Sequence, residues 1–390
     1  MQAHVMTILF DLLGAQPNNV GSKYHGGGEY IKTVFKRLVE LYSEEHKIIV
    51  FYNKDKFIDE WILKLIAEKN ITEYLINEYG ELNIIFDKEN IDVYYSGMPY
   101  ERLDFPMPHQ VRKIGTIHGL RSLEKPTDYY EYKYKNGLQC FKSLLKLILQ
   151  KHFKIKAYKH YQEIVSHYDD IVCDSNHTFY AMKSFYSHLK ISFRVFYPPA
   201  KYIENNYDTI PKVSGKYILM LGLDRWEKNG YRAIMAIEDL LQKGFLKDYK
   251  IALVGNVSSQ IASRMKHESQ YVKYNYLETS ELENLYKNCD FLVYPSLNEG
   301  FGLPPLEAMK YGKTCVVSAI CSLTEVCGNA VYYFNPYDLD EMKNRILMAS
   351  ENKIDKDIIF LHVNKLTLKQ QEDLDALCHF IVDEKHLLGA

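Results

Sequence analysis

The stretch from Cys289 to Lys313, CDFLVYPSLNEGFGLPPLEAMKYGK, constrains the fold of this chain most strongly. Four apolar residues, Phe291–Tyr294, have the length and composition of a buried strand, which Pro295 ends. Pro304-Pro305 is typical of the first turn of a helix, and Gly312 is typical of a C-terminal stop. The segment therefore predicts a strand, a loop and a helix.

The loop between this strand and helix has the composition of a ligand-binding loop. It carries Glu299, Gly300 and Gly302, and glycines let a bulky group approach the backbone closely. A loop before a helix directs backbone N–H groups and the positive end of the helix dipole at one point, which suits an anion. Because carboxylates repel phosphate, Glu299 and Glu307 are better suited to accept hydrogen bonds from neutral hydroxyls. Phosphate and hydroxyls together describe a nucleotide sugar, but an ordinary strand–loop–helix unit explains the spacing equally well.

A second candidate anion site follows the strand predicted at Tyr217–Leu221. The next segment, GLDRWEKN, places Arg225 and Lys228 just before a helix predicted to run to Gln242. Cations at a helix start oppose the preference of the helix dipole for acids, and a bound anion would resolve that conflict. The alternative is that both side chains are merely solvated.

The amino-terminal half alternates predicted strands with helices, which argues for parallel α/β layering. Glu29–Ser43 has one apolar face, as a helix requires, and Pro198-Pro199 with the polar stretch to Pro211 predicts an interdomain linker. The predicted strands cover residues 5–13, 47–52, 83–86, 92–96, 112–117, 169–173 and 193–197.

Two features of this half are candidates for ligand binding. The glycines of His25-Gly26-Gly27-Gly28 come just before the first predicted helix and leave N–H groups unobstructed, although a glycine turn alone is a weak signal. His118 follows the strand predicted at 112–117, at the edge where open α/β sheets bind ligands. A lone histidine is more often structural than catalytic, so both interpretations of His118 stay open on these residues alone.

The central segment resembles the donor-site motif of the retaining glycosyltransferases of family four, or glycosyl transferases group one. In that motif two glutamates flank seven residues within E-G-F-G-L-P-x-x-E, which matches Glu299 to Glu307. The resemblance covers most of the chain, well in the carboxyl-terminal half and loosely in the amino-terminal half. It implies an α/β protein of the GT-B fold, with two Rossmann-like domains facing each other across a donor-binding cleft. We therefore expect an acceptor-side domain at 1–205, a nucleotide-sugar-binding domain at 206–370, and a tail at 371–390 that crosses back to the first domain.

The resemblance also implies a role for each candidate residue. Glu299 would bind hydroxyls of the donor sugar and Glu307 the ribose, while Arg225 and Lys228 would hold the diphosphate. His118 would contact the transferred sugar, so His118 and Glu299 are the predicted catalytic residues. The other predicted donor-binding residues are Gly26, Gly27, Gly28, Gly300, Phe301, Gly302 and Leu303.

The chain departs from the family pattern at two of these positions. Leu223 occupies the usual arginine position, so Arg225 must act from a shifted place. Gly119 follows His118, where an aspartate is commoner.

Composition argues against several other classes of protein. A net charge of −2 provides no global field for nucleic acid, and no apolar run reaches the length of a membrane span. No basic segment precedes the amino-terminal apolar run, so a signal peptide is not expected. Seven cysteines without a C-x-x-C pair indicate buried thiols in a cytoplasmic protein. The D-x-D runs at 338–340 and 373–375 do not follow strands, so we expect no metal and no cofactor beyond the nucleotide-sugar substrate.

The implied activity is transfer of a sugar from a nucleoside diphosphate to an acceptor hydroxyl, with retention of configuration, in the synthesis of a cell-surface polysaccharide or glycolipid. One alternative is a nucleotide-sugar epimerase on the same scaffold, which needs an acid/base set that the sequence does not show. The other is a non-catalytic sugar-binding or partner subunit, against which the joint presence of Glu299, Glu307 and Lys228 argues.

The stretch 132–162 contains eight lysines and no acidic residue. Apolar residues recur in it at spacings of three and four, as in a basic amphipathic helix. Such a helix is a candidate contact with an anionic membrane at its cytoplasmic face, which would suit a lipid-linked rather than a free saccharide acceptor. A core-packed helix with solvated lysines explains the same pattern.

Overall fold

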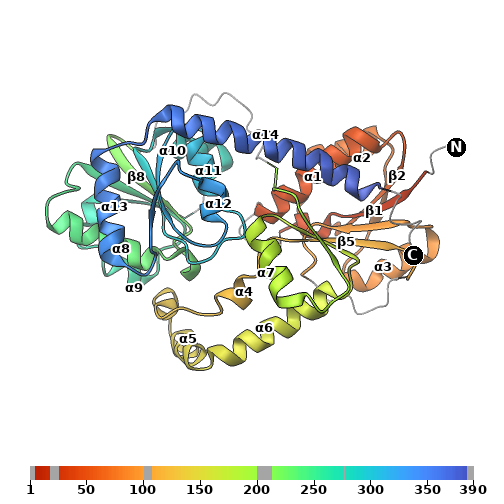
Figure 1. Ribbon diagram of the computed structural model, residues 1–390, viewed down its shortest axis with the longest axis horizontal. Helices are drawn as coiled ribbons and strands as arrows, with labels where there is room; N and C mark the ends of the chain where they lie inside the picture. Colours follow the sequence, from red (N-terminus) through yellow and green to blue (C-terminus); the bar gives the residue numbers. More distant parts are fainter. Residues whose placement is uncertain (1–4, 18–25, 101–107, 200–212, 276, 384–390) are drawn as a thin grey trace. The chain divides into compact units, whose positions relative to one another are not determined.

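The computed structural model describes residues 5–17, 26–100, 108–199, 213–275 and 277–383. The chain forms two compact α/β units, each built on its own parallel sheet (Figure 1). The first unit comprises Met1–Leu120, Tyr158–Tyr202 and Thr367–Ala390, and the second comprises Arg121–Ala157 and Ile203–Leu366. The prediction of a two-part α/β protein is thereby confirmed.

The first unit has a seven-stranded sheet in the order β3-β2-β1-β4-β5-β6-β7. The order reverses direction between β1 and β4, as in Rossmann-like folds, and the buried face of α1 packs against β1 and β2. The strands are β1 (Thr7–Asp11), β2 (Lys47–Tyr52), β3 (Thr72–Leu75), β4 (Val93–Ser96), β5 (Arg112–Ile117), β6 (Asp170–Cys173) and β7 (Ser192–Val195). The helices are α1 (Gly26–Tyr42), α2 (Glu60–Glu68), α3 (Leu82–Lys88) and α7 (Asn176–Tyr186), with 3-10 turns η1 (Leu13–Ala15) and η2 (Tyr79–Glu81).

The second unit has a six-stranded sheet in the order β10-β9-β8-β11-β12-β13. Numbered from its own first strand this is the order 3-2-1-4-5-6 of a Rossmann fold, with the switch point between β8 and β11. The strands are β8 (Lys216–Leu221), β9 (Tyr249–Val254), β10 (Tyr271–Tyr274), β11 (Phe291–Tyr294), β12 (Thr314–Ser318) and β13 (Tyr332–Phe334). The helices are α4 (Arg121–Glu124), α5 (Leu138–Ile148), α8 (Gly230–Gln242), α9 (Ser259–Ala262), α10 (Thr279–Asn288), α11 (Leu303–Met309), α12 (Leu323–Cys327) and α13 (Leu339–Glu351), with 3-10 turns η3 (Glu131–Tyr134), η4 (Trp226–Lys228) and η5 (Glu268–Gln270).

Residues 121–157 group with the second unit, although they precede residue 205 in the sequence. The guanidinium of Arg232 in α8 makes hydrogen bonds of 2.8 and 3.2 Å to Asp128 and lies 4.6 Å from the ring of Tyr130. The backbone N–H of Tyr231 donates to Tyr134 Oη at 2.7 Å. A buried, paired arginine beneath an aromatic ring therefore fixes this segment on α8.

Two long helices have residues in both units. The first is α6 (Gln150–Val165), and the second is α14 (Lys356–Ile381), which Figure 1 shows as one continuous helix. The last turns of α14 complete the core of the first unit with Leu377, Cys378 and Ile381. Arg112 secures this end of the helix, because its Nη1 donates to the carbonyl oxygen of Phe380 at 2.8 Å.

Most predicted elements are confirmed, including the strands at β2, β5, β8 and β11. The strand predicted at 83–86 is wrong, because Asn83–Phe86 lies in α3, where Leu82 and Ile85 are buried and Ile84 is exposed. The first predicted helix begins earlier than expected, at Gly26, so the three glycines lie in its first turn rather than in the preceding loop. The predicted linker falls outside the described residues from position 200 onward.

Candidate functional site

The loop after β8 is shaped by a glycine beneath a lysine side chain. Gly222 has a φ of 71°, which favours glycine. A Cβ at this position would lie 2.9 Å from Cγ of Lys228. Asn229, with a φ of 58°, then turns the chain into α8, and its Nδ2 donates to the carbonyl oxygen of Pro336 at 3.0 Å. Gly222 therefore leaves room for the Lys228 side chain at the switch point of the sheet.

The loop after β11 places Glu299 against Lys228. Oε1 of Glu299 accepts hydrogen bonds from Lys228 Nζ at 2.5 Å, Tyr294 Oη at 2.7 Å and Ser296 Oγ at 2.6 Å. The two charged side chains are only 11% and 8% exposed. Burial alone would raise the pKa of Glu299, but Lys228 and the two hydroxyls outweigh it and lower that pKa to about 2. Glu299 is therefore an ionised, buried carboxylate at neutral pH.

The segment from Gly300 to Leu303 packs closely against the start of α12. Oγ of Ser322 lies 3.0 Å from the carbonyl oxygen of Glu299 and 2.8 Å from that of Phe301. Gly302 has a φ of 107°, and a Cβ there would lie 2.4 Å from Cδ2 of Leu323. The side chain of Phe301 is buried, so a ligand contact at this position would come from the backbone.

Glu307 lies in the middle of α11. This helix begins at Leu303, which makes Glu307 its fifth residue. Its side chain is half-buried. Burial, together with the nearby Glu307 carboxylate, raises the pKa of the Tyr286 hydroxyl.

Arg225 is held by an acid that the sequence reasoning missed. Its Nε and Nη2 lie 3.1 and 3.0 Å from Oε1 of Glu227, which is buried in η4. Leu223, at the position where the resemblance expects an arginine, is buried in the core of the unit. Tyr294 and Ser296 were also missed, although their place at the carboxyl end of a predicted strand could have revealed them.

His118 follows β5 in the first unit, as predicted. Its Nε2 lies 2.8 Å from the carbonyl oxygen of Gly97, so the proton is on Nε2, and its Nδ1 lies 3.5 Å from Asp174 Oδ2. The edge of the ring faces Tyr30, with 4.7 Å between the ring centroids. The imidazole is thus oriented by groups from three neighbouring elements of this unit.

The three glycines lie in the first turn of α1 in the same unit. A Cβ on Gly27 would lie 2.3 Å from Sδ of Met98, and Gly28 is buried. Close packing of the helix therefore accounts for at least one of them. The structure joins Lys228 to Glu299 directly, whereas His118 and the three glycines belong to a different unit from these residues.

Aspartates of both D-x-D runs form hydrogen bonds or ion pairs within the protein. Asp338 caps α13 by accepting hydrogen bonds from the backbone N–H groups of Asp340 and Glu341 at 2.9 and 3.0 Å. Asp373 accepts a hydrogen bond of 2.9 Å from the backbone N–H of Tyr197, and Asp375 forms an ion pair of 2.6 Å with Arg37.

Two Rossmann-like units, each on its own parallel sheet, are the architecture of the GT-B fold. Residues 205–361 match the family described as glycosyl transferases group 1. The serotype-specific mannosyltransferase WbdA of Escherichia coli is 34% identical over 136 residues, which are 33% of this chain and 17% of the relative. The O-antigen chain mannosyltransferase B of Escherichia coli is 33% identical over 142 residues, 35% of this chain and 37% of the relative.

The fold as a whole resembles that of solved glycosyltransferases. Anabaena HepE, crystallised with UDP and glucose, superposes with a TM-score of 0.60 at 14% identity, over 98% of this chain and 97% of its own. WaaG, a glycosyltransferase of lipopolysaccharide biosynthesis, superposes with a TM-score of 0.58 at 12% identity, over 97% of this chain and 100% of its own. The chain spans well under two thirds of these curated relatives' own length, while the likeness in fold extends over both units.

Proposed function

We propose that this protein is a retaining glycosyltransferase that moves a sugar from a nucleoside diphosphate to an acceptor hydroxyl, in the synthesis of a cell-surface polysaccharide or glycolipid. The observation that carries the proposal is the buried Lys228–Glu299 pair at the switch point between β8 and β11, within the segment that matches the family. Because two relatives are named as mannosyltransferases, a mannosyl donor is the first candidate.

The proposed mechanism uses the charges in their observed positions. Lys228 and Arg225 stabilise the negative charge that develops on the leaving diphosphate. Glu299 is ionised and accepts hydrogen bonds from hydroxyls of the donor sugar, while Glu307 binds the ribose. His118 contacts the transferred sugar, and the acceptor attacks the same face from which the diphosphate leaves, so that configuration is retained. The proposed reaction needs no metal and no cofactor besides the nucleotide sugar.

A panel of nucleotide sugars that includes a mannosyl donor tests the proposal, with release of nucleoside diphosphate as the readout. Glu299→Ala should abolish transfer, and Glu299→Gln should lower it strongly, because the amide cannot replace an ionised acceptor. Glu351→Gln, which changes an exposed carboxylate at the end of α13, is the matched control. An epimerase would convert the sugar without releasing diphosphate, and a non-catalytic subunit would do neither. Near-normal transfer by a well-folded Glu299→Ala would contradict the donor-site assignment.

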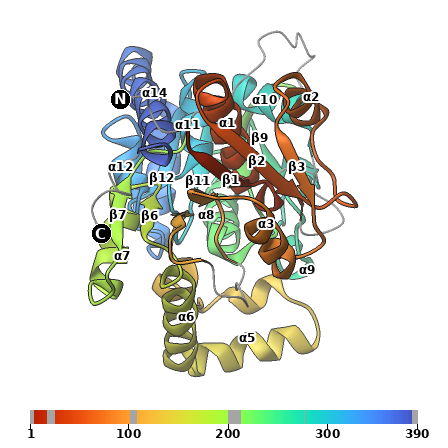
Figure 2. The same cartoon turned by 90° about the vertical axis from the view of Figure 1, so that its right-hand side faces the viewer.

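The acceptor side of the proposal rests on α5, which turns its apolar face outward. Leu138, Phe141, Leu145 and Ile148 are spaced by three and four residues and are 70, 65, 44 and 78% exposed. Ser143, on the opposite side of the helix, is buried. A helix packed through its apolar face would show the reverse pattern, so this burial argues against a core-packed helix. Figure 2 shows a sharp bend between α5 and the start of α6, where one continuous helix had been expected.

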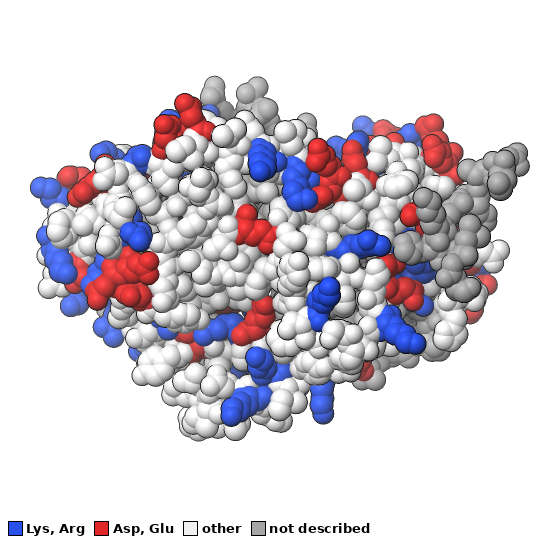
Figure 3. Space-filling model, viewed as in Figure 1, with Lys and Arg blue, Asp and Glu red and all other residues white. Residues whose placement is uncertain are grey.

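Lysines accompany this apolar face. Lys142, Lys151 and Lys156 are exposed, and Figure 3 shows basic side chains set in uncharged surface over α5 and α6. Lys146 differs from them, because it forms an ion pair of 3.3 Å with Glu131. None of the described helices is long and apolar enough to cross a membrane. We propose that α5 contacts the surface of an anionic bilayer, with each exposed lysine contributing about 1 kcal/mol to the free energy of binding.

Sedimentation with anionic vesicles tests the membrane contact. Wild-type protein should bind at low salt and dissociate at high salt. Phe141→Ser and the triple exchange of Lys142, Lys151 and Lys156 for Glu should each abolish binding. Leu361→Ser, which changes a residue 76% exposed in α14, is the control for loss of any exposed apolar side chain. Wild-type protein that ignores anionic vesicles at low salt would contradict the contact, as would a concentration-dependent dimer that Phe141→Ser dissociates.

A further inference from the structure

The short helix α4 is tied to both loops of the proposed donor site. At its first residue, Arg121 Nη1 donates to Glu227 Oε1 in η4 at 3.0 Å. At its last residue, Glu124 Oε2 accepts a hydrogen bond of 2.8 Å from Asn298 Nδ2 in the loop after β11. The residues that follow these two partners in the sequence form the buried lysine–glutamate pair. α4 therefore lies beside the proposed diphosphate-binding site.

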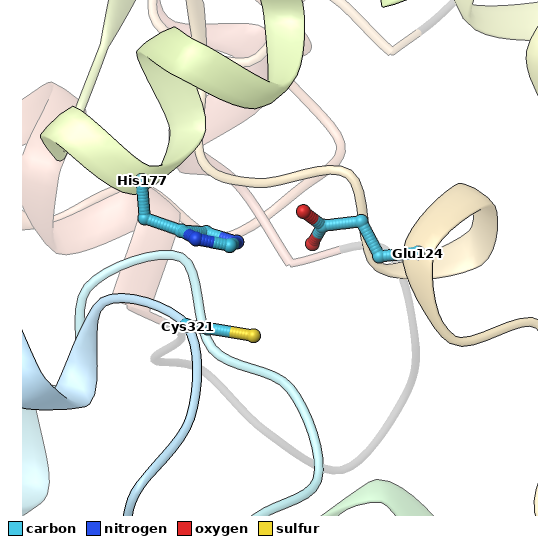
Figure 4. A group of neighbouring side chains, drawn as sticks. All are labelled: Glu124, His177 and Cys321. Atoms are coloured by element: carbon cyan, nitrogen blue, oxygen red, sulfur yellow. The ribbon is translucent and has the colours of Figure 1, made fainter. Parts of the chain in front are cut away.

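The contact at the end of α4 is part of a small polar cluster. Asn298 is buried, and its Nδ2 also lies 3.3 Å from Sγ of Cys321. Figure 4 shows the Glu124 carboxylate and the Cys321 thiol directed into the same space; the third labelled residue, His177, belongs to α7 of the other unit. Asn298 Nδ2 thus contacts both Glu124 and Cys321, and through Glu124 it links α4 to the loop that carries Glu299.

Two arginines share one carboxylate oxygen at the start of α4. Oε1 of Glu227 lies 3.0 Å from Nη1 of Arg121 and 3.0 Å from Nη2 of Arg225. Burial alone would raise the pKa of Glu227, but Arg225, a backbone N–H group and Arg121 together outweigh it and lower that pKa. A single carboxylate neutralises only one of the two arginines. Their side chains are 40 and 42% exposed, so both keep surface that an incoming anion can reach.

The same cluster has an excess of positive charge around Lys228. Burial lowers the pKa of Lys228, and the charges of Arg225 and Arg121 add to that effect against the attraction of Glu299. Arg121 Nε is buried, and among the residues that the structure describes it has no hydrogen-bond acceptor. The cluster therefore has three cations, Arg121, Arg225 and Lys228, but two carboxylates. The excess positive charge and the Arg121 Nε–H without an acceptor among the described residues favour binding of an anion.

We propose that Arg121 is a diphosphate-binding residue of this site and that Glu227 is the positioning residue that holds Arg121 and Arg225 side by side. This inference rests on the proposed function and adds a residue from outside the matched family segment, which begins at 205. A guanidinium offers a planar fork of N–H donors that fits phosphate oxygens. Two guanidinium groups on one carboxylate can contact a diphosphate while Lys228 meets the same charge from the strand end.

Calorimetric titration with UDP, GDP, ADP and dTDP, and with the matching nucleosides, tests the inference. For the diphosphate that the wild type binds, Arg121→Ala should weaken affinity about ten- to a hundredfold, the usual loss for one charge-assisted hydrogen bond. Affinity for the matching nucleoside should stay unchanged. Arg121→Lys should recover part of the loss. The matched control is Arg345→Ala, which removes a 33% exposed arginine paired with Glu341 in α13 and should bind as wild type does.

The possible results separate this inference from the function on which it rests. A wild type that binds no nucleoside diphosphate contradicts the proposed function itself. Diphosphate binding that Arg121→Ala leaves intact overturns only the role of Arg121. If Arg121→Ala weakens nucleoside and diphosphate equally and lowers the melting temperature, Arg121 serves only to hold α4, and the inference is overturned as well.

Discussion

Removing both partners of the buried Lys228–Glu299 pair should cost clearly less stability than the sum of the two single losses. Glu299→Gln removes the negative charge beside the buried ammonium group of Lys228, which keeps only neutral acceptors such as Tyr294 Oη at 2.7 Å and the new amide oxygen. Lys228→Met leaves a buried carboxylate that still accepts from two hydroxyls. Loss of one partner of a buried pair costs roughly 3–5 kcal/mol, and we expect Lys228→Met at the lower end because those hydroxyls stay.

The pKa of Glu299 supports the same magnitude. It is lowered from 4.5 to about 2, and at 1.36 kcal/mol per unit this corresponds to roughly 3 kcal/mol. Because the folded-state pKa lies below the unfolded one, this stabilisation is present above pH 4.5 and is lost as the pH falls toward 2. The wild type should therefore lose stability over that range more steeply than the double variant Lys228→Met/Glu299→Gln.

The assay is urea unfolding of the two single variants and the double variant at pH 7. The chain has two tryptophans, Trp61 in α2 of the first unit and Trp226 in η4 of the second. In a Trp61→Phe background, fluorescence reports on Trp226 and so on the unit that contains the pair. Lys243→Met, which removes an exposed 2.9 Å ion pair with Asp239 in α8, should change stability by less than about 1 kcal/mol and is the control.

The two single variants and the double variant form a double-mutant cycle that can refute this reasoning. If the pair interacts as its geometry indicates, the double variant should be more stable than the sum of the two single losses predicts, with a coupling of about 2–3 kcal/mol. Single effects that add in the double variant would show that Lys228 and Glu299 are each solvated in solution. The structural basis of the proposed donor site would then be lost.

Three further outcomes are expected. His118→Ala should lower turnover more than donor affinity, measured by steady-state kinetics, and a sharp fall in melting temperature with unchanged turnover per folded molecule would make His118 structural. Transfer should survive EDTA, and a loss that Mg²⁺ or Mn²⁺ reverses would assign a metal to the reaction. Gly27→Ala should destabilise the protein by about 1–3 kcal/mol in thermal unfolding, because its Cβ would meet Sδ of Met98 at 2.3 Å; an unchanged melting temperature would contradict that packing.

The pattern of apolar residues was sufficient to predict a helix or strand where the buried positions follow the helical or strand period. The strand at Phe291–Tyr294 is buried at all four residues, so a short apolar run between turn signals located it. β3 (Thr72–Leu75) escaped prediction because its four residues alternate between partial and full exposure and include no strong apolar run. Three apolar residues in a row at 84–86 are too short a run to separate the period of a strand from that of a helix, and the buried positions Leu82 and Ile85 turn out to be spaced as in a helix.

The polar partners at the candidate site could not be predicted in the same way, because they meet across long stretches of chain. Glu227 stands two residues from Arg225, and an ion pair over that distance in the sequence was open to prediction. Its second partner, Arg121, is 106 residues away, and no periodicity or composition connects the two. What joins them is the packing of Asp128 and its neighbours on α8, in a segment whose position in the sequence suggests the other unit. The sequence therefore shows that residue 121 is an arginine, but only the folded structure shows that Arg121 lies beside Glu227.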